Sequence, residues 1–255
     1  MENVKIIADF FLVSLARGFV LFSPVASSKL TGTGFIKLIS NLAIGALVIS
    51  AILSLLSKAA ISSPFVYLKM ISLVALVFTS LFHRDDKTWF MWALYVVVVF
   101  SLAVVLYLFS PQLPNALFLW SSSLLLGIIT YAMVLGHWYL VVPKLSEKPL
   151  LMAGLMTWGI LFGKVIFSAF STYKHFDFFE SQTTLGAGYA FNWLLLSMRV
   201  SFGYLVILVM SVFNWKLVRI RSIQSSTGIL YAMTFFVFVG ELISTYLFFN
   251  YGLHI

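Results

Sequence analysis

Long apolar runs separated by short polar segments make up most of the chain. The polar breaks include SSKLTGTG, HRDDKT and PKLSEKP. Each run between breaks holds about 20 mostly apolar residues, which is the length that a helix needs to cross a bilayer. The pattern predicts about eight transmembrane helices, at approximately residues 6–26, 35–56, 61–82, 89–109, 116–142, 149–170, 187–214 and 228–250.

The polar segments are too short to form a soluble domain, so we expect residues 1–255 to be a single transmembrane domain. Their cations are divided unequally between the two sides that eight helices create. One side holds both termini and carries Lys5, Lys58 and Lys174, whereas the other carries Lys29, Arg84, Lys87, Lys144, Lys148, Lys216, Arg219 and Arg221. Because cytoplasmic loops are enriched in Lys and Arg, the sequence predicts that both termini face outward.

Composition supports the same interpretation. Hydrophobic residues make up 62% of the chain and charged residues 9%, against roughly 25% charged in soluble domains, and the mean hydropathy is +1.05. So few charges cannot cover the surface against water. The predicted fold is therefore an all-α polytopic helix bundle embedded in a lipid bilayer, and we expect a bacterial inner membrane.

Net charge and cysteine content narrow the function classes. The net charge of +8 is interpreted as a topology signal, so no nucleic-acid partner is expected. Cysteine is absent, which excludes disulfides, thiolate nucleophiles and iron–sulfur clusters bound by this chain. Any redox metal or flavin must then belong to a partner subunit, or a haem must be held by histidines.

Four charged residues lie deep within the predicted spans: Arg17, Lys164, Arg199 and Glu241. Each lies roughly 16–22 Å along its helix from the end where the helix enters the membrane. A central charge costs on the order of 3 kcal/mol, so such residues rarely face lipid. We therefore expect a shared polar site between helices.

Two interpretations of this site stay open. It is either a buried ion-pair network, with Glu241 paired to Arg199 or Arg17, or a pocket of surplus positive charge that receives a polar or anionic group. Neighbouring polar side chains such as Asn192 and Ser197 are available to add hydrogen bonds. Nearer the membrane surfaces, Lys37 is expected to extend to the headgroups, and Lys69 either does the same or is buried.

A histidine interrupts the apolar run YAMVLGHWYLVV. His137 is expected about 8 Å below the cytoplasmic surface. It is a neutral imidazole bonded to a neighbouring helix, a ligand-binding or proton-transfer group, or a haem ligand. A b-type haem usually needs two axial histidines, and His83, His175 and His254 fall in loops or the tail. We expect no haem, no metal site and no covalently bound cofactor.

The last helix, FFVFVGELISTYLFF, resembles the last helix of the membrane anchor subunits of dimethyl-sulfoxide-reductase-type complexes. Those anchors have about eight helices, some with both termini outside. The resemblance implies a cofactor-poor integral subunit that binds quinol and passes electrons to an iron–sulfur partner. It covers about 15 residues, and Ser244-Thr245 stands where the family would have a Gly-Arg-like pair.

The first hypothesis is therefore a quinone-interacting subunit of a larger complex that is not catalytic alone. Arg199, Arg17 or Lys164 would donate a hydrogen bond to a quinone carbonyl, while Glu241 or His137 takes the proton. Such chemistry needs a cation beside a titratable group, because each added electron must be matched by charge or a proton. The alternatives are a transporter or channel for a small anion or anionic lipid, and a non-catalytic membrane scaffold.

Overall fold

The computed structural model describes residues 2–26, 28–56, 64–82, 89–142, 145–180, 183 and 186–255. The long helices are α1 (Glu2–Phe22), α3 (Thr33–Leu56), α4 (Pro64–Phe82), α5 (Trp89–Leu108), α6 (Leu113–Val141), α7 (Lys148–Lys174), α8 (Tyr189–Val200), α9 (Ile207–Arg219) and α10 (Ile223–Tyr251). Shorter elements are η1 (Ser23–Val25), α2 (Ser28–Thr31), η2 (Phe176–Phe179) and η3 (Ser201–Val206). The described chain is helical throughout, apart from its turns and connections.

Eight helical segments among the described residues are long and apolar enough to cross a membrane. This confirms the predicted all-α polytopic bundle. The spans are Asn3–Val25, Gly34–Leu56, Pro64–Phe82, Trp89–Leu108, Leu113–Val141, Lys148–Lys174, Tyr189–Arg219 and Ile223–Tyr251. The seventh span continues to Arg219, beyond the predicted end at 214. Lys216 and Arg219 lie in its last turn, where the negative end of the helix dipole favours cations.

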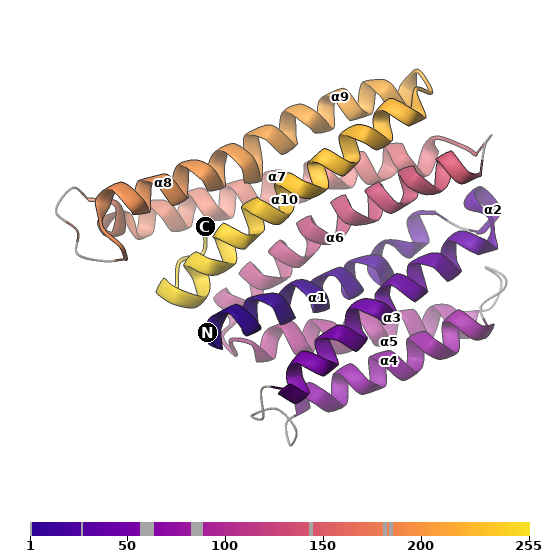
Figure 1. Ribbon diagram of the computed structural model, residues 1–255, viewed down its shortest axis with the longest axis horizontal. Coiled ribbons are helices and arrows are strands. Elements are labelled where there is room, and N and C mark those ends of the chain that lie inside the picture. Colours follow the sequence, from indigo (N-terminus) through magenta and orange to yellow (C-terminus); the bar gives the residue numbers. More distant parts are fainter. Residues whose placement is uncertain are drawn as a thin grey trace.

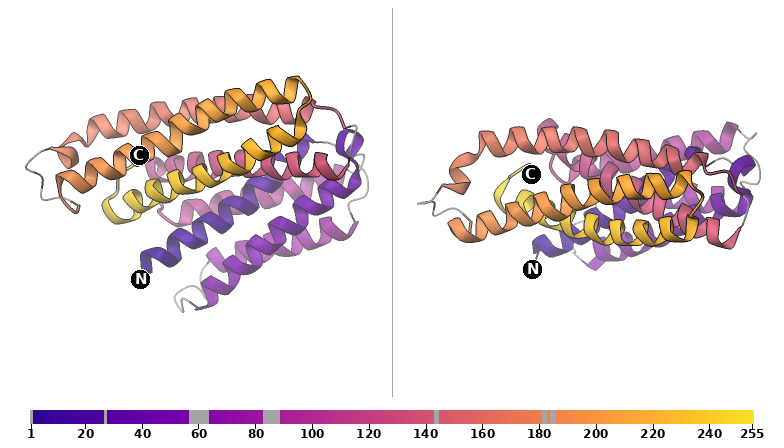
Figure 2. Two further views of the ribbon diagram at one scale, coloured as in Figure 1. Left: turned by 45° about the horizontal axis from the view of Figure 1, so that its top comes forward. Right: turned by 90° about the horizontal axis from the view of Figure 1, so that it is seen from above.

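Helices α1, α6 and α10 form the centre of the bundle (Figure 1). Helices α3, α4 and α5 pack on one side of this centre, and α7, α8 and α9 pack on the other (Figure 2). The spans formed by α1 and α6 are the most buried. Polar residues on α1, α6 and α10 therefore meet inside the protein rather than in lipid.

Two glycine pairs bring helix backbones into direct contact. A Cβ on Gly127 of α6 would lie 2.6 Å from the Cα of Gly18 on α1, and a Cβ on Gly240 of α10 would overlap the Cα of Gly203 in η3. Small residues allow this approach, which strengthens helix packing in lipid. Arg17 and Glu241 adjoin these glycines in the sequence. The two glycine contacts therefore set the positions of both charged residues inside the bundle.

The seventh span is interrupted by a π-helical segment, η3. A π-turn places residues i and i+5 on the same side of the helix, where an ordinary α-helix would rotate them apart. The segment begins two residues after Arg199, so it changes which side chains can reach that arginine.

The first helix begins and the last helix ends toward the same end of the bundle (Figure 1), as an even number of spans requires. Part of the charge bias used to orient the chain lies outside the described residues: Lys58, Arg84, Lys87 and Lys144. His83 also lies outside them. The outward orientation of the termini stays a prediction.

Candidate functional site

Three of the four predicted intramembrane charges meet between α7, α8 and α10. The Nη2 atom of Arg199 lies 3.0 Å from Oε1 of Glu241, and Nζ of Lys164 lies 3.4 Å from Oε2 of the same carboxylate. All three side chains are completely buried. We call Lys164, Arg199 and Glu241 the charge cluster.

The charge cluster carries one carboxylate for two cations. Among the described residues, Nε and Nη1 of Arg199 have no hydrogen-bond partner. Buried charges are stable only when they are paired and hydrogen-bonded. The cluster therefore keeps a surplus positive charge and unused donors.

Hydroxyl groups extend the cluster in two directions. On one side, Nη2 of Arg199 donates to the hydroxyl of Tyr204 at 2.8 Å, and this hydroxyl lies 2.5 Å from Oγ of Ser168. On the other side, Nζ of Lys164 donates to Oγ of Ser122 on α6. A continuous polar path thus crosses from α6 through the cluster to α7.

Aromatic faces cover both cations of the cluster. The guanidinium of Arg199 lies 4.2 Å from the ring centroid of Tyr204, and Nζ of Lys164 lies 4.6 Å from that of Phe118. The ring quadrupoles stabilise the cations without neutralising them. The surplus positive charge is therefore not neutralised by these rings.

Sequence reasoning missed Tyr204 and Ser168 and chose other hydrogen-bonding neighbours. Tyr204 reaches Arg199 because the π-turn brings residues five apart together. The suggested Asn192 instead donates to the carbonyl of Phe178, and Ser197 donates to a carbonyl in its own helix. Serine and tyrosine are common in membrane helices, so neither residue was a signal, and the π-turn leaves no mark on the hydrophobic pattern.

Arg17 lies apart from the charge cluster. Its Nη1 atom donates to Oγ of Ser123 on α6 at 3.3 Å. The ion pairs among the described residues do not include it. From the sequence, Glu241 could pair with either Arg199 or Arg17. The structure keeps Arg17 apart from Glu241.

A second buried ion pair joins α1 to α4. The Nζ atom of Lys69 lies 2.7 Å from both carboxylate oxygens of Asp9 and 2.9 Å from Oγ of Ser54. The hydroxyl of Ser50 donates to the same carboxylate. Lys69 is thus buried and fully paired, whereas Lys37 is exposed on the bundle surface as expected.

His137 is exposed on α6, with its Nδ1 atom 2.9 Å from the hydroxyl of Tyr231 on α10. It therefore bonds to a neighbouring helix, one of the roles considered for it, and it lies apart from the charge cluster. The two residues that follow His137 bond to other parts of the chain. Nε1 of Trp138 donates to the backbone carbonyl of Thr31, and the hydroxyl of Tyr139 donates to the backbone carbonyl of Ser146. This motif ties connecting segments to the bundle.

Metal ligation has no support in the described part of the chain, where no three His, Asp or Glu side chains gather. The polar groups that gather instead are cations, a carboxylate and hydroxyls. They suit an organic ligand with oxygen acceptors better than a metal ion.

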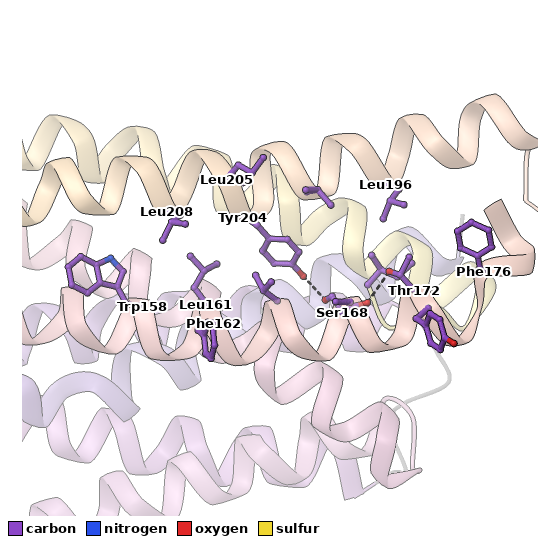
Figure 3. Close-up of a pocket in the computed structure, with 15 residues that line it drawn as sticks. Trp158, Leu161, Phe162, Ser168, Thr172, Phe176, Leu196, Tyr204, Leu205 and Leu208 are labelled. Carbon is purple, nitrogen blue, oxygen red and sulfur yellow. Dashed lines mark hydrogen bonds between the residues drawn. The ribbon is translucent and has the colours of Figure 1, made fainter. Parts of the chain in front are cut away.

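A cavity of about 580 Å³ lies between α7 on one side and α8, η3 and α9 on the other (Figure 3). Trp158 on α7 lies toward one end and Phe176 in η2 toward the other (Figure 3). Its walls are mostly apolar; the side chains of Tyr204 and Ser168 point toward each other near the middle, and Thr172 and Tyr173 line the part nearer Phe176. Tyr204 thus belongs both to the cavity wall and to the hydrogen-bond path from Arg199.

Comparisons of this chain with protein-family models, curated proteins and solved structures find no match.

Proposed function

We propose that this integral membrane protein is the quinone-binding subunit of a larger complex of a bacterial inner membrane. The cavity between α7 and α9 receives the quinone or quinol. One observation carries the proposal: a tyrosine hydroxyl on the wall of an apolar, membrane-embedded cavity is bonded directly to a buried charge cluster.

The shape of the cavity suits an isoprenoid quinone. Ligand sites usually enclose about 300–1,000 Å³ and combine apolar walls with a few placed polar groups. Here the apolar length accepts the hydrocarbon tail, and the ring lies at Tyr204 and Ser168. The ligand enters sideways from lipid, between α7 and α8, which pack little against each other.

The charges suit the reaction of the quinone head. Reduction of a quinone to a quinol consumes two electrons and two protons. The Tyr204 hydroxyl donates a hydrogen bond to a quinone carbonyl, and the surplus charge at Arg199 and Lys164 stabilises the negative charge that develops there. The hydroxyls of Tyr204 and Ser168, which lie 2.5 Å apart, exchange protons with the head, and Glu241 holds Arg199 in position beside Tyr204. The electrons come from, or pass to, an iron–sulfur centre of a partner subunit.

The same geometry counts against a purely structural role. A scaffold would need a mutually satisfied ion network and no adjoining cavity. Arg199 instead keeps two unpartnered nitrogen atoms, and Tyr204 connects it to open space. A carrier for an anionic lipid would use the same surplus charge, so the experiment must separate the two ligands.

Photoaffinity labelling of the purified full chain with an azido-quinone tests the proposal. We expect label on peptides of α7 and α8–α9, displaced by unlabelled quinone. Tyr204→Phe should weaken binding at least tenfold, which is about 1.4 kcal/mol, because it removes the hydroxyl and little volume. Tyr173→Phe is the matched control, since Tyr173 lines the same cavity but is largely exposed.

Equal binding by wild type and Tyr204→Phe, or label spread over all lipid-facing helices, would overturn the assignment. Displacement by a long-chain fatty acid but not by quinone would favour the transport of an anionic lipid instead.

A further inference from the structure

Arg17 is a buried cation whose charge nothing in the charge cluster balances. The residue is 9% exposed, and its Nε atom has no hydrogen-bond partner among the described residues. The one hydrogen bond that the described part of the chain provides for it is long and goes to the neutral hydroxyl of Ser123. The described carboxylates Asp9 and Glu241 are occupied by other cations.

The guanidinium cannot relieve this charge by proton loss or by reaching water. Arginine stays protonated in proteins. Side chains on a helix lean toward its N-terminus, so Arg17 extends away from the near end of α1 at Phe22 and toward the middle of the membrane. Ser123, which receives its hydrogen bond, is 1% exposed.

A second polar group beside Arg17 also lacks a partner. Ser14 is completely buried, and its hydroxyl makes no hydrogen bond to any residue that the structure describes. Ser14 and Arg17 are three residues apart on α1, so they lie on one face, and the guanidinium lies over the turn that holds Ser14. A buried hydroxyl without a hydrogen bond is destabilising, so a ligand that accepts one from it is favoured here.

We propose that Arg17, Ser14 and Ser123 form a binding site for one small monovalent inorganic anion, of the size and charge of chloride. Such an ion accepts hydrogen bonds from Nε of Arg17 and from both hydroxyls, and it neutralises the guanidinium. A bridging water would satisfy the donors but leave the charge uncompensated in a low-dielectric interior.

The surroundings select a small ligand. Phe10, Val13 and Ala16 on α1 are completely buried, and the Gly18–Gly127 contact holds α1 tightly against α6. Arg17 does not line the quinone cavity. The anion site is therefore independent of the proposed quinone site.

Thermal unfolding of the purified full chain tests the site. The unfolding midpoint is measured while chloride replaces gluconate at constant ionic strength, and bromide is tested in the same way. We expect a saturable rise in the midpoint with chloride and with bromide. Arg17→Gln should abolish this rise, whereas Arg219→Gln, the same change at an exposed arginine, should preserve it.

Two milder variants keep the test decisive if Arg17→Gln does not fold. Ser123→Ala should raise the half-saturating chloride concentration at least threefold, and Arg17→Lys should retain a weakened response. A midpoint that does not distinguish chloride from gluconate in wild type would overturn the proposal. So would an unchanged response in both Arg17→Gln and Ser123→Ala. A bromide anomalous peak at Arg17 would support it directly.

Discussion

Glu241 balances two buried cations, so its charge affects stability more than any exposed acid. In Glu241→Gln, Arg199 and Lys164 stay buried without a carboxylate. Removing one partner of a buried ion pair typically costs about 3–5 kcal/mol. We expect a loss of this size in the free energy of unfolding, measured by reversible unfolding in mixed micelles.

The exposed pair between Glu147 and Arg221, 3.0 Å apart, supplies the control. Glu147→Gln should change stability little, because water replaces the lost partner. Lys164→Met combined with Glu241→Gln should recover part of the loss, since one uncompensated cation is gone. A double variant less stable than Glu241→Gln alone would contradict this account of the cluster.

At the residue scale, the sequence shows which charges are buried but not their partners. Arg199, Lys164 and Glu241 stand out because charges within apolar runs are rare and must face the interior. Tyr204 does not stand out, since tyrosine is common in this chain and in membrane helices generally. The pairing of Lys69 with Asp9 could not be predicted either, because it depends on α3 and α5 both packing against α1 and α4, which brings the long side chain of Lys69 within reach of Asp9.

At the element scale, Gly18 should be intolerant of any side chain. A Cβ there would overlap the backbone of Gly127, so Gly18→Ala must push α1 away from α6. Overpacking of this kind typically costs about 1–3 kcal/mol. Gly45→Ala is the matched control, because a Cβ on Gly45 meets no atom within 4 Å. The measurement is the unfolding free energy in mixed micelles, and equal values for the two variants would contradict the close crossing.

Residues 252–255 follow the last helix and pack back against the bundle. The chain reverses at Gly252, whose φ of 71° favours glycine, and Leu253 and Ile255 are buried. His254 packs against Phe118 and lies 2.7 Å from Oδ1 of Asn115. Burial lowers the pKa of His254, and the nearby His175 and Lys174 lower it further.

Docking of this segment should therefore weaken in acid. The docked imidazole has a lower pKa than the free one, so the docked state binds fewer protons. Its stabilisation is complete above the ordinary histidine pKa of about 6.5 and is lost as the pH falls through the lower, docked value. We expect amides 253–255 to exchange hydrogen faster at pH 5 than at pH 7.5, after correction for intrinsic rates. His254→Gln should remove this difference, and a pH effect that persists in that variant would exclude His254 as its source.

The existence and type of the helices follow from hydropathy, because a bilayer sets the length of each apolar run. The π-turn after Arg199 and the reversal at Gly252 do not. The π-turn accompanies the contact with Gly240, and the reversal accompanies the burial of Ile255. Both are features of local backbone geometry, and neither changes the hydrophobic pattern.

At the scale of the whole molecule, the central position of α1, α6 and α10 also escapes sequence reasoning. All eight spans are apolar, and lipid competes equally for every apolar face, so hydrophobicity does not choose helix neighbours. Small residues and polar residues determine which helices pack together instead. The glycine contacts of α1 with α6 and of α10 with η3, together with the ions between α7, α8 and α10, fix the arrangement.

The orientation of this bundle in the membrane can be measured cleanly, because the chain has no cysteine and an introduced thiol is the one reactive site. Gln112 and Glu180 lie in connections that the charge bias places outside, whereas Glu147 and Gln224 lie at the opposite end, and a cysteine is introduced singly at each. A membrane-impermeant maleimide should label Gln112→Cys and Glu180→Cys in intact cells. It should label Glu147→Cys and Gln224→Cys after lysis alone. The inverse pattern would place both termini in the cytoplasm, and different results within either pair would contradict the eight-span topology itself.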